Sequence, residues 1–188
     1  MIEIKIEQRV FTLPLNWEEV TFKKFIDIIQ VQQDTLNSEL DVYVKILTSL
    51  SGEKEFDQAL RGMDFEDFSQ LKTYFSWITE DLDSDKYKSK EEVFLIDGEK
   101  WKLKDDLHTL NVGEMVSLEM MIRDNKLDLT PYEIAFGVLF RRVDENGNEL
   151  PFKAEDMVKI IMDYSDKIFV TDIIGKLAFF FDGEKTSS

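Results

Sequence analysis

The sequence predicts an α+β fold that is predominantly helical and built from two tandem similar halves, each a β-hairpin followed by about four helices. Three observations predict it. Apolar and charged residues alternate at the start of the chain, which is the period of a half-buried strand. Later segments carry apolar residues at helical spacing behind capping residues. The same order of elements then recurs about ninety residues further along the chain.

The first expected element is a β-hairpin with strands near 2–7 and 10–15. Ile2, Ile4 and Ile6 alternate with charged residues, and "VFTLPL" follows after a short polar break. Pro14 cannot donate a hydrogen bond to a neighbouring strand, so we expect it at a strand end or edge.

Four helices are expected after this hairpin. Thr21 should cap the first and Ser38 the second, because their side chains can accept hydrogen bonds from the first helical turn. Gly52 should end the second helix, and a short third helix should cover 53–60. Asp64 should cap the fourth.

Each of the long helices in this half has one apolar face. In the first helix the face is Phe22, Phe25, Ile26 and Ile29. In the second it is Val42, Ile46, Leu47 and Leu50. In the fourth it is Phe65, Phe68, Leu71, Phe75 and Ile78. We expect these residues to form the core of the first half.

The polar segment 81–92 is predicted to link a first half, 1–80, to a second half, 93–188, with the halves packing as one compact unit. Asp97-Gly98 lies between two apolar runs and predicts the second hairpin.

The second half is expected to repeat the helices of the first. Asn111 should cap its first helix, and Thr130-Pro131-Tyr132-Glu133 opens the next with a capping box. Asn146-Gly147 indicates a tight turn. Two further helices are expected at about 153–162 and 172–181.

The order of elements and the agreement of their caps favour a tandem duplication over the alternative, which is that any capped amphipathic helix resembles any other. Residue by residue, the proposed matches are Trp17 with Leu107, Thr21 with Asn111, Phe22 with Val112, Phe25 with Met115, Ile26 with Val116, and Ser38 with Thr130. We therefore expect the apolar stripe of the first helix to be buried in both copies. If one copy is exposed instead, we expect it to be a partner-binding face.

The composition excludes several classes of protein. The 188 residues carry 39 acids and 23 bases, a net charge of −16, which disfavours binding to nucleic acid phosphates or to anionic membranes. Cysteine is absent, so disulfides, thiolate catalysis and cysteine-based zinc sites are excluded. We expect no secretory signal in "MIEIKIEQRV" and no membrane span.

No catalytic, cofactor-binding or metal-binding residue is predicted, and we do not expect an enzyme. The single histidine, His108, has no second histidine or cysteine for a metal site and no serine elbow for a triad, so we interpret it as a turn residue. Asp81, Asp83, Asp85, Tyr87, Ser89 and Glu92 follow the spacing of a calcium loop. Lys86, however, occupies the position that requires glycine, so we interpret this segment as a solvated linker.

Several segments together resemble a family of phage proteins. The segments are "LPLNWEEVTFKKFIDII", "VKILTSLSG", "KWKLKDDLHTLNVGEMVSLEMMI" and "KLAFFF". They are similar to the small acidic virion and tail-assembly proteins, often called tail assembly chaperone-like, of tailed bacteriophages that include crAss-like phages. The family pattern has no active site, so no functional residue is transferred.

The resemblance implies a structural or packaged component of a phage particle, located in the virion or, during assembly, in the host cytoplasm. Its expected partners are other phage structural proteins. A soluble tail assembly chaperone is the first alternative. An acidic DNA mimic that inhibits a host nucleic-acid-binding protein is the second, motivated by the charge of −16.

Overall fold

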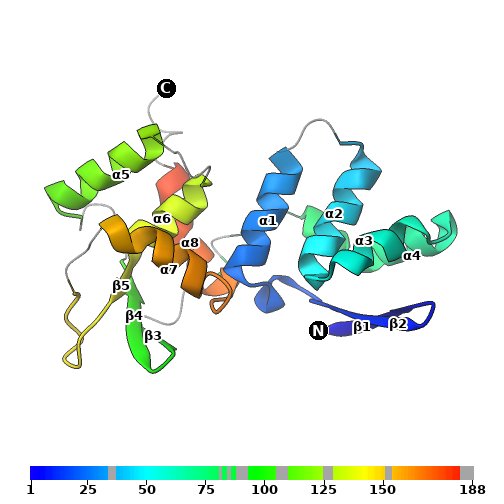
Figure 1. The fold of residues 1–188 in the computed structure, drawn as a ribbon, viewed down its shortest axis with the longest axis horizontal. Coiled ribbons are helices and arrows are strands. Elements are labelled where there is room, and N and C mark those ends of the chain that lie inside the picture. The colour runs from blue at the N-terminus through cyan, green and yellow to red at the C-terminus, as the bar shows by residue number, and fades with distance from the viewer. Residues whose placement is uncertain are drawn as a thin grey trace. The chain divides into compact units, whose positions relative to one another are not determined.

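The computed structural model describes residues 1–33, 37–80, 82–83, 86–87, 93–104, 110–124, 129–150 and 154–182, without the side chains at 118, 121–122, 124, 154–155 and 178–182. Its helices and two small sheets confirm the predicted α+β, predominantly helical class. The chain divides into two compact units, Met1–Leu82 and Asp83–Ser188, whose elements are labelled in Figure 1. Most of the predicted linker 81–92 lies outside the described residues.

The first unit is a β-hairpin followed by helices. Its elements are β1 (Ile2–Ile6), β2 (Arg9–Leu13), the 3-10 helix η1 (Trp17–Glu19), α1 (Phe22–Gln33), α2 (Glu39–Ser51), α3 (Lys54–Arg61), α4 (Phe65–Tyr74) and the 3-10 helix η2 (Ser76–Thr79). The two strands pair antiparallel, with Ile4 opposite Phe11. Their turn takes only Glu7 and Gln8, and Pro14 follows β2 directly, as predicted for a strand end.

Aromatic side chains join the elements of the first unit. Phe11 of β2 packs against Phe56 of α3, with 4.6 Å between ring centroids. The Trp17 ring forms T-shaped contacts with the rings of Phe25 and Trp77, with centroid distances of 6.1 Å and 5.0 Å. One of these contacts therefore joins the hairpin to α3, and the others join η1 to α1 and η2.

The predicted ends of α2 are confirmed. The Ser38 hydroxyl accepts a hydrogen bond of 3.2 Å from the backbone N–H of Asp41. Gly52 follows the helix with a φ of 76°, a left-handed conformation that costs glycine little. Asp64 precedes α4 as predicted, but its side chain makes no capping hydrogen bond there.

The predicted apolar faces of α1 and α2 need correction. Ile28 of α1 is fully buried, whereas Ile29 is only half-buried. On α2, Tyr43 and Val44 are buried and Val42 is half-buried. The physical reason is that α2 packs against α1, α3 and β2, so it must bury more of its circumference than one stripe.

The predicted face of α4 is wrong at its first residue. Phe65 is 74% exposed, whereas Phe68 and Leu71, one and two turns further on, are buried. In the core, the Phe68 ring forms a T-shaped contact with Tyr43 on α2, with 6.3 Å between ring centroids. The α-helix also ends at Tyr74, and the tighter turn of η2 then buries Ile78.

The second unit has a three-stranded sheet and four helices among its described residues. Its elements are β3 (Val93–Ile96), β4 (Glu99–Leu103), α5 (Val112–Asp124), α6 (Pro131–Leu139), β5 (Phe140–Arg142), α7 (Ala154–Tyr164) and α8 (Val170–Asp182). The predicted turn is confirmed, because Asp97 and Gly98 both have positive φ, 53° and 80°. β5, which was not predicted, pairs antiparallel with β4.

Helix α6 is the centre of the second unit. The predicted capping box at its start is confirmed: the Thr130 side chain accepts from the Glu133 N–H, and the Glu133 carboxylate accepts from the Thr130 N–H at 2.7 Å. All its residues from Ile134 to Leu139 are buried, so it is apolar on every side rather than on one stripe. A Cβ at Gly137 would overlap Cγ of Met157 on α7.

The predicted burial of the second apolar stripe is wrong. On α5, Val112 is 81% exposed and Val116 is 48% exposed, while Met115 is half-buried. Phe22 and Ile26 of α1, the residues proposed to match Val112 and Val116, are buried. None of the described helices is long and apolar enough to cross a bilayer.

Candidate functional site

A stripe of exposed apolar side chains runs along α5. It consists of Val112, Val116 and Met120, which are 81%, 48% and 49% exposed. Their spacing of four residues places them on one side of the helix, one turn above the next. We call these three residues the α5 stripe. An apolar row of this kind is the usual form of a helical binding surface.

The opposite side of α5 is held to the sheet by charged groups. Glu114 is only 6% exposed, and it is the one buried residue of α5 among those whose side chains are described. One of its carboxylate oxygens lies 3.3 Å from Nη2 of Arg141 on β5. The other lies 3.6 Å from Nζ of Lys104, which follows β4.

The same carboxylate also caps α5. It accepts a hydrogen bond of 2.9 Å from the backbone N–H of Asn111, whose side chain accepts one of 3.0 Å from the Glu114 N–H. This reciprocal pair is a capping box with asparagine as the cap, and it confirms the prediction for Asn111. Glu114 therefore fixes both the start of α5 and the side that faces the sheet.

The buried cations near Glu114 are neutralised by acids. Lys104 is also 3.1 Å from the carboxylate of Glu149, so the four side chains pair two cations with two carboxylates. Burial lowers the pKa of the Arg141 guanidinium, and Glu114 and Glu149 oppose that shift. Each of these charged side chains is paired with one of opposite charge within the protein. We therefore interpret the group as an anchor for α5 rather than as an active site.

A second candidate surface is a groove in the first unit, between α2, α3 and α4. Its cavity has a volume of about 610 Å³. The floor is apolar and buried, formed by Val44, Leu60 and Phe68. Leu40, 47% exposed, and Phe65, 74% exposed, line it where they remain open to solvent. We call this surface the α2–α4 groove.

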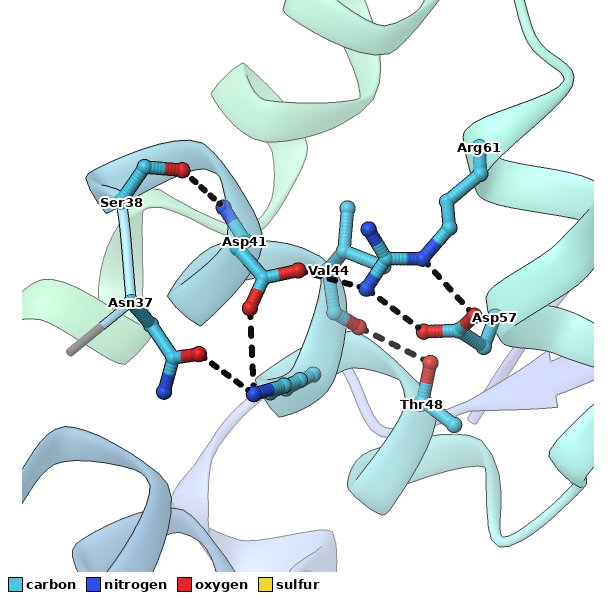
Figure 2. Close-up of polar contacts among 8 residues, drawn as sticks. Asn37, Ser38, Asp41, Val44, Thr48, Asp57 and Arg61 are labelled. Atoms are coloured by element: carbon cyan, nitrogen blue, oxygen red, sulfur yellow. Dashed lines mark hydrogen bonds and ion pairs between the residues drawn. The ribbon is translucent and has the colours of Figure 1, made fainter. Parts of the chain in front are cut away.

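Three residues that line the α2–α4 groove, Asn37, Asp41 and Arg61, belong to the polar network drawn in Figure 2. Arg61 at the end of α3 reaches Asp41 of α2 at 2.6 Å and Asp57 of its own helix at 2.8 Å. Lys45 lies 3.1 Å from the other oxygen of Asp41 and 2.6 Å from the side-chain oxygen of Asn37. The network therefore ties the first turn of α2 to the last turn of α3.

This network holds its charges in place. Hydrogen bonds from Arg61 and then Lys45 lower the pKa of the Asp41 carboxyl. Hydrogen bonds to Asp57 and Asp41 raise the pKa of Arg61. Because both cations are already matched by carboxylates, they are poor candidates for binding an anionic ligand.

The second unit has a cleft of its own, with a volume of about 760 Å³, lined in part by Trp101, Phe140 and Tyr164. The Trp101 ring stacks on Phe140 at 4.9 Å and lies 4.5 Å from Tyr164. Burial raises the pKa of the Tyr164 hydroxyl. At the margin Arg142 pairs with Glu99 at 2.6 Å. The aromatic rings pack on one another, so we interpret them as core residues of the sheet that form one wall of this cleft.

The sequence candidates for chemistry are mostly outside the described residues. His108 is among them, as are Asp81, Asp85, Ser89 and Glu92 of the calcium-like spacing. Among the residues that the structure does describe, no group of three or more histidines, cysteines or acids could hold a metal ion.

Sequence reasoning missed the α2–α4 groove, and it named the stripe of α5 as a partner-binding face only in the case that one copy is exposed. It assigned Val112, Val116 and Phe65 to the core, because apolar residues at helical spacing usually face inward. One available signal was Glu114, since an acid three residues after Asn111 completes a capping box and so competes for the inner side of the helix.

Comparison of the chain with models of protein families, with curated proteins and with solved structures finds no match.

Proposed function

We propose that this chain is a non-enzymatic structural or packaged component of a tailed-phage particle, associated with its tail, neck or capsid, and acting through protein–protein contacts. The α5 stripe carries the proposal. Three apolar side chains in one row on a chain with a net charge of −16 are an unfavourable surface in water unless a partner covers them.

The chemistry of the chain supports other phage structural proteins as the partners. The excess of acids disfavours nucleic acid phosphates and anionic lipids, and it favours neutral or basic protein surfaces. The resemblance of "NWEEVTFKKFIDII" and "NVGEMVSLEMMI" to the virion and tail-assembly proteins suggests the setting.

We also propose that the two units arose by tandem duplication. Each begins with an antiparallel hairpin, followed by a helix that starts after Thr21 or Asn111 and then by a helix capped by Ser38 or Thr130. An experimental structure in which these segments superpose, with Phe22 on Val112, would support the proposal. Superposition only in another register would overturn it.

Mass spectrometry of purified virions tests the proposed location. We expect the protein in mature particles, released together with tail, neck or capsid proteins when particles are dissociated. Its absence from mature particles would contradict the proposal.

The α5 stripe also fits the alternative, a soluble tail assembly chaperone, because such a protein must present an apolar surface to an unassembled partner. This alternative predicts co-purification with an unassembled tail protein from infected cells and loss of the protein from finished particles. Detection in finished virions only would exclude it.

A set of variants connects either function to the stripe. Replacing Val112, Val116 and Met120 together by serine should abolish incorporation or co-purification, while far-UV circular dichroism stays unchanged. Met162→Ser is the matched control, because Met162 is 71% exposed on α7 of the same unit. Equal incorporation of the triple variant and the wild type would show that the stripe is not the contact surface.

A further inference from the structure

The α2–α4 groove has the features of a docking site for a helix. Its floor of Val44, Leu60 and Phe68 comes from three different helices, and none of these residues is more than 5% exposed. Leu40 and Phe65 also line the groove and remain open to solvent. Buried apolar walls beside an exposed aromatic residue are typical of the anchor positions of protein interfaces.

The elements around the groove favour a helix over a strand as the occupant. The groove is lined by α2, by the end of α3 and by the start of α4, and it includes no residue of the β1–β2 hairpin. A bound strand needs a free sheet edge for its backbone hydrogen bonds, whereas a helix needs only apolar pockets for side chains spaced three or four residues apart.

The charge around the groove indicates the chemistry of the partner. Between Ser38 and Ser69 the chain has eight acids and three bases. The bases Arg61 and Lys45 are already paired with Asp41. Asp64, Glu66 and Asp67 are exposed at the start of α4, beside Phe65, and no cation of the described residues pairs with them.

These three acids also have a local role, because negative charge stabilises the N-terminus of a helix. That role does not explain the exposed phenylalanine between Asp64 and Glu66. A partner with apolar side chains for the floor and lysine or arginine beside them would satisfy both features.

We propose that the α2–α4 groove binds a basic amphipathic helix of a partner protein, with aliphatic side chains against Val44, Leu60 and Phe68 and with cations beside Asp64, Glu66 and Asp67. This proposal goes beyond the proposed function, because it concerns a different surface and holds whether or not the chain belongs to a phage particle.

The test measures binding of a synthetic helical peptide to the full chain by fluorescence anisotropy. The probe is a labelled peptide of leucine and lysine arranged with all leucines on one helical face. A scrambled peptide of the same composition has the same charge but no apolar face. We expect the amphipathic peptide to bind on the order of 10-fold more tightly than the scrambled one. Equal affinity would show charge attraction alone and would overturn the proposal.

Variants locate the binding site. Phe65→Ser together with Leu40→Ser should weaken binding by roughly 10-fold, since exposed aromatic anchors dominate such interfaces. Tyr74→Ser is the matched control, because Tyr74 is also on α4 and is 73% exposed, but it does not line the groove. The double variant Glu66→Lys with Asp67→Lys should also weaken binding of the amphipathic peptide.

The triple serine variant of the α5 stripe separates this proposal from the previous one. We expect it to bind the peptide as tightly as the wild type. If the stripe variant loses binding and the Phe65 variant does not, the peptide binds α5, and the proposal for the groove is overturned. All variants are compared at the same salt concentration, since charge attraction is screened by ions.

Discussion

Removal of the Glu114 carboxylate tests whether charged groups hold α5 in place. The side chains of Glu114, Arg141 and Lys104 are 7%, 3% and 9% exposed, so the change Glu114→Ala leaves two buried cations with less compensation. Removing one partner of a buried ion pair lowers the free energy of unfolding by about 3–5 kcal/mol. Glu149 still lies 3.1 Å from Lys104 and compensates part of this loss.

The same substitution removes the acceptor for the Asn111 N–H, which adds about 1 kcal/mol for a lost capping interaction. We therefore expect Glu114→Ala to lower the free energy of unfolding of the second unit by about 4 kcal/mol. Glu114→Gln keeps an acceptor for Asn111 but loses the charge, and it should cost less than the alanine variant. Glu119→Ala, at an exposed position of the same helix, should change stability by no more than about 0.5 kcal/mol.

The assay must report on the second unit alone. The chain has three tryptophans, of which Trp17 and Trp77 lie in the first unit and Trp101 in the second. In a background with Trp17→Phe and Trp77→Phe, urea unfolding followed by fluorescence reports the environment of Trp101, which stacks on Phe140. If Glu114→Ala and Glu119→Ala have equal unfolding midpoints, the ion pairs do not anchor α5 and the reasoning is refuted.

Three further predictions concern packing and pH. Phe68→Ala should lower the free energy of unfolding by about 3–5 kcal/mol. Phe65→Ala should change it by no more than about 0.5 kcal/mol in urea unfolding, because its ring is 74% exposed. Equal losses would place both rings in the core. Gly137→Ala should lower the melting temperature, because overpacking costs about 1–3 kcal/mol and outweighs the helix preference of alanine. Gly113→Ala should not lower the melting temperature, because only the Asn111 side chain lies within 4 Å of its added Cβ. Burial raises the pKa of Tyr43 from 10.0 to about 12, so the unfolded chain loses this proton first as the pH rises. The stability that this provides, about 3 kcal/mol, should be complete below pH 10 and lost between pH 10 and 12. Tyr43→Phe should flatten the slope of urea stability over that range, and an unchanged slope would contradict the prediction.

Helix boundaries were the most predictable part of the fold. Ser38, Gly52 and Thr130 act locally, through hydrogen bonds or backbone conformations within one turn. The neighbouring residues in the sequence are therefore enough to identify them as helix ends. The Asp97-Gly98 turn is equally local, because both of its residues need positive φ. The fold class follows from these elements.

The sides that the helices bury were less predictable, because they depend on distant segments. β5 has only three residues and follows α6 without a turn residue, so it exists through its pairing with β4 rather than through a pattern of its own. Phe65, the first residue of α4, is 74% exposed although it continues the apolar spacing of Phe68. No helical periodicity contains that information.

The proposed duplication gives the α5 stripe a physical explanation. When Thr21 is matched with Asn111, Glu114 corresponds to Lys24. In the first unit Lys24 is half-buried and its ammonium donates a hydrogen bond of 2.5 Å to the carbonyl of Leu50 on α2.

In the second unit the corresponding position is an acid, and Arg141 and Lys104 lie where they can pair with it. Glu114 is therefore drawn inward, and the residues two positions before and after it turn outward. These are Val112 and Val116, whose counterparts in α1 are buried. Under the proposed duplication, a polar position next to the apolar stripe thus accounts for one helix whose stripe closes a core and another whose stripe stays exposed.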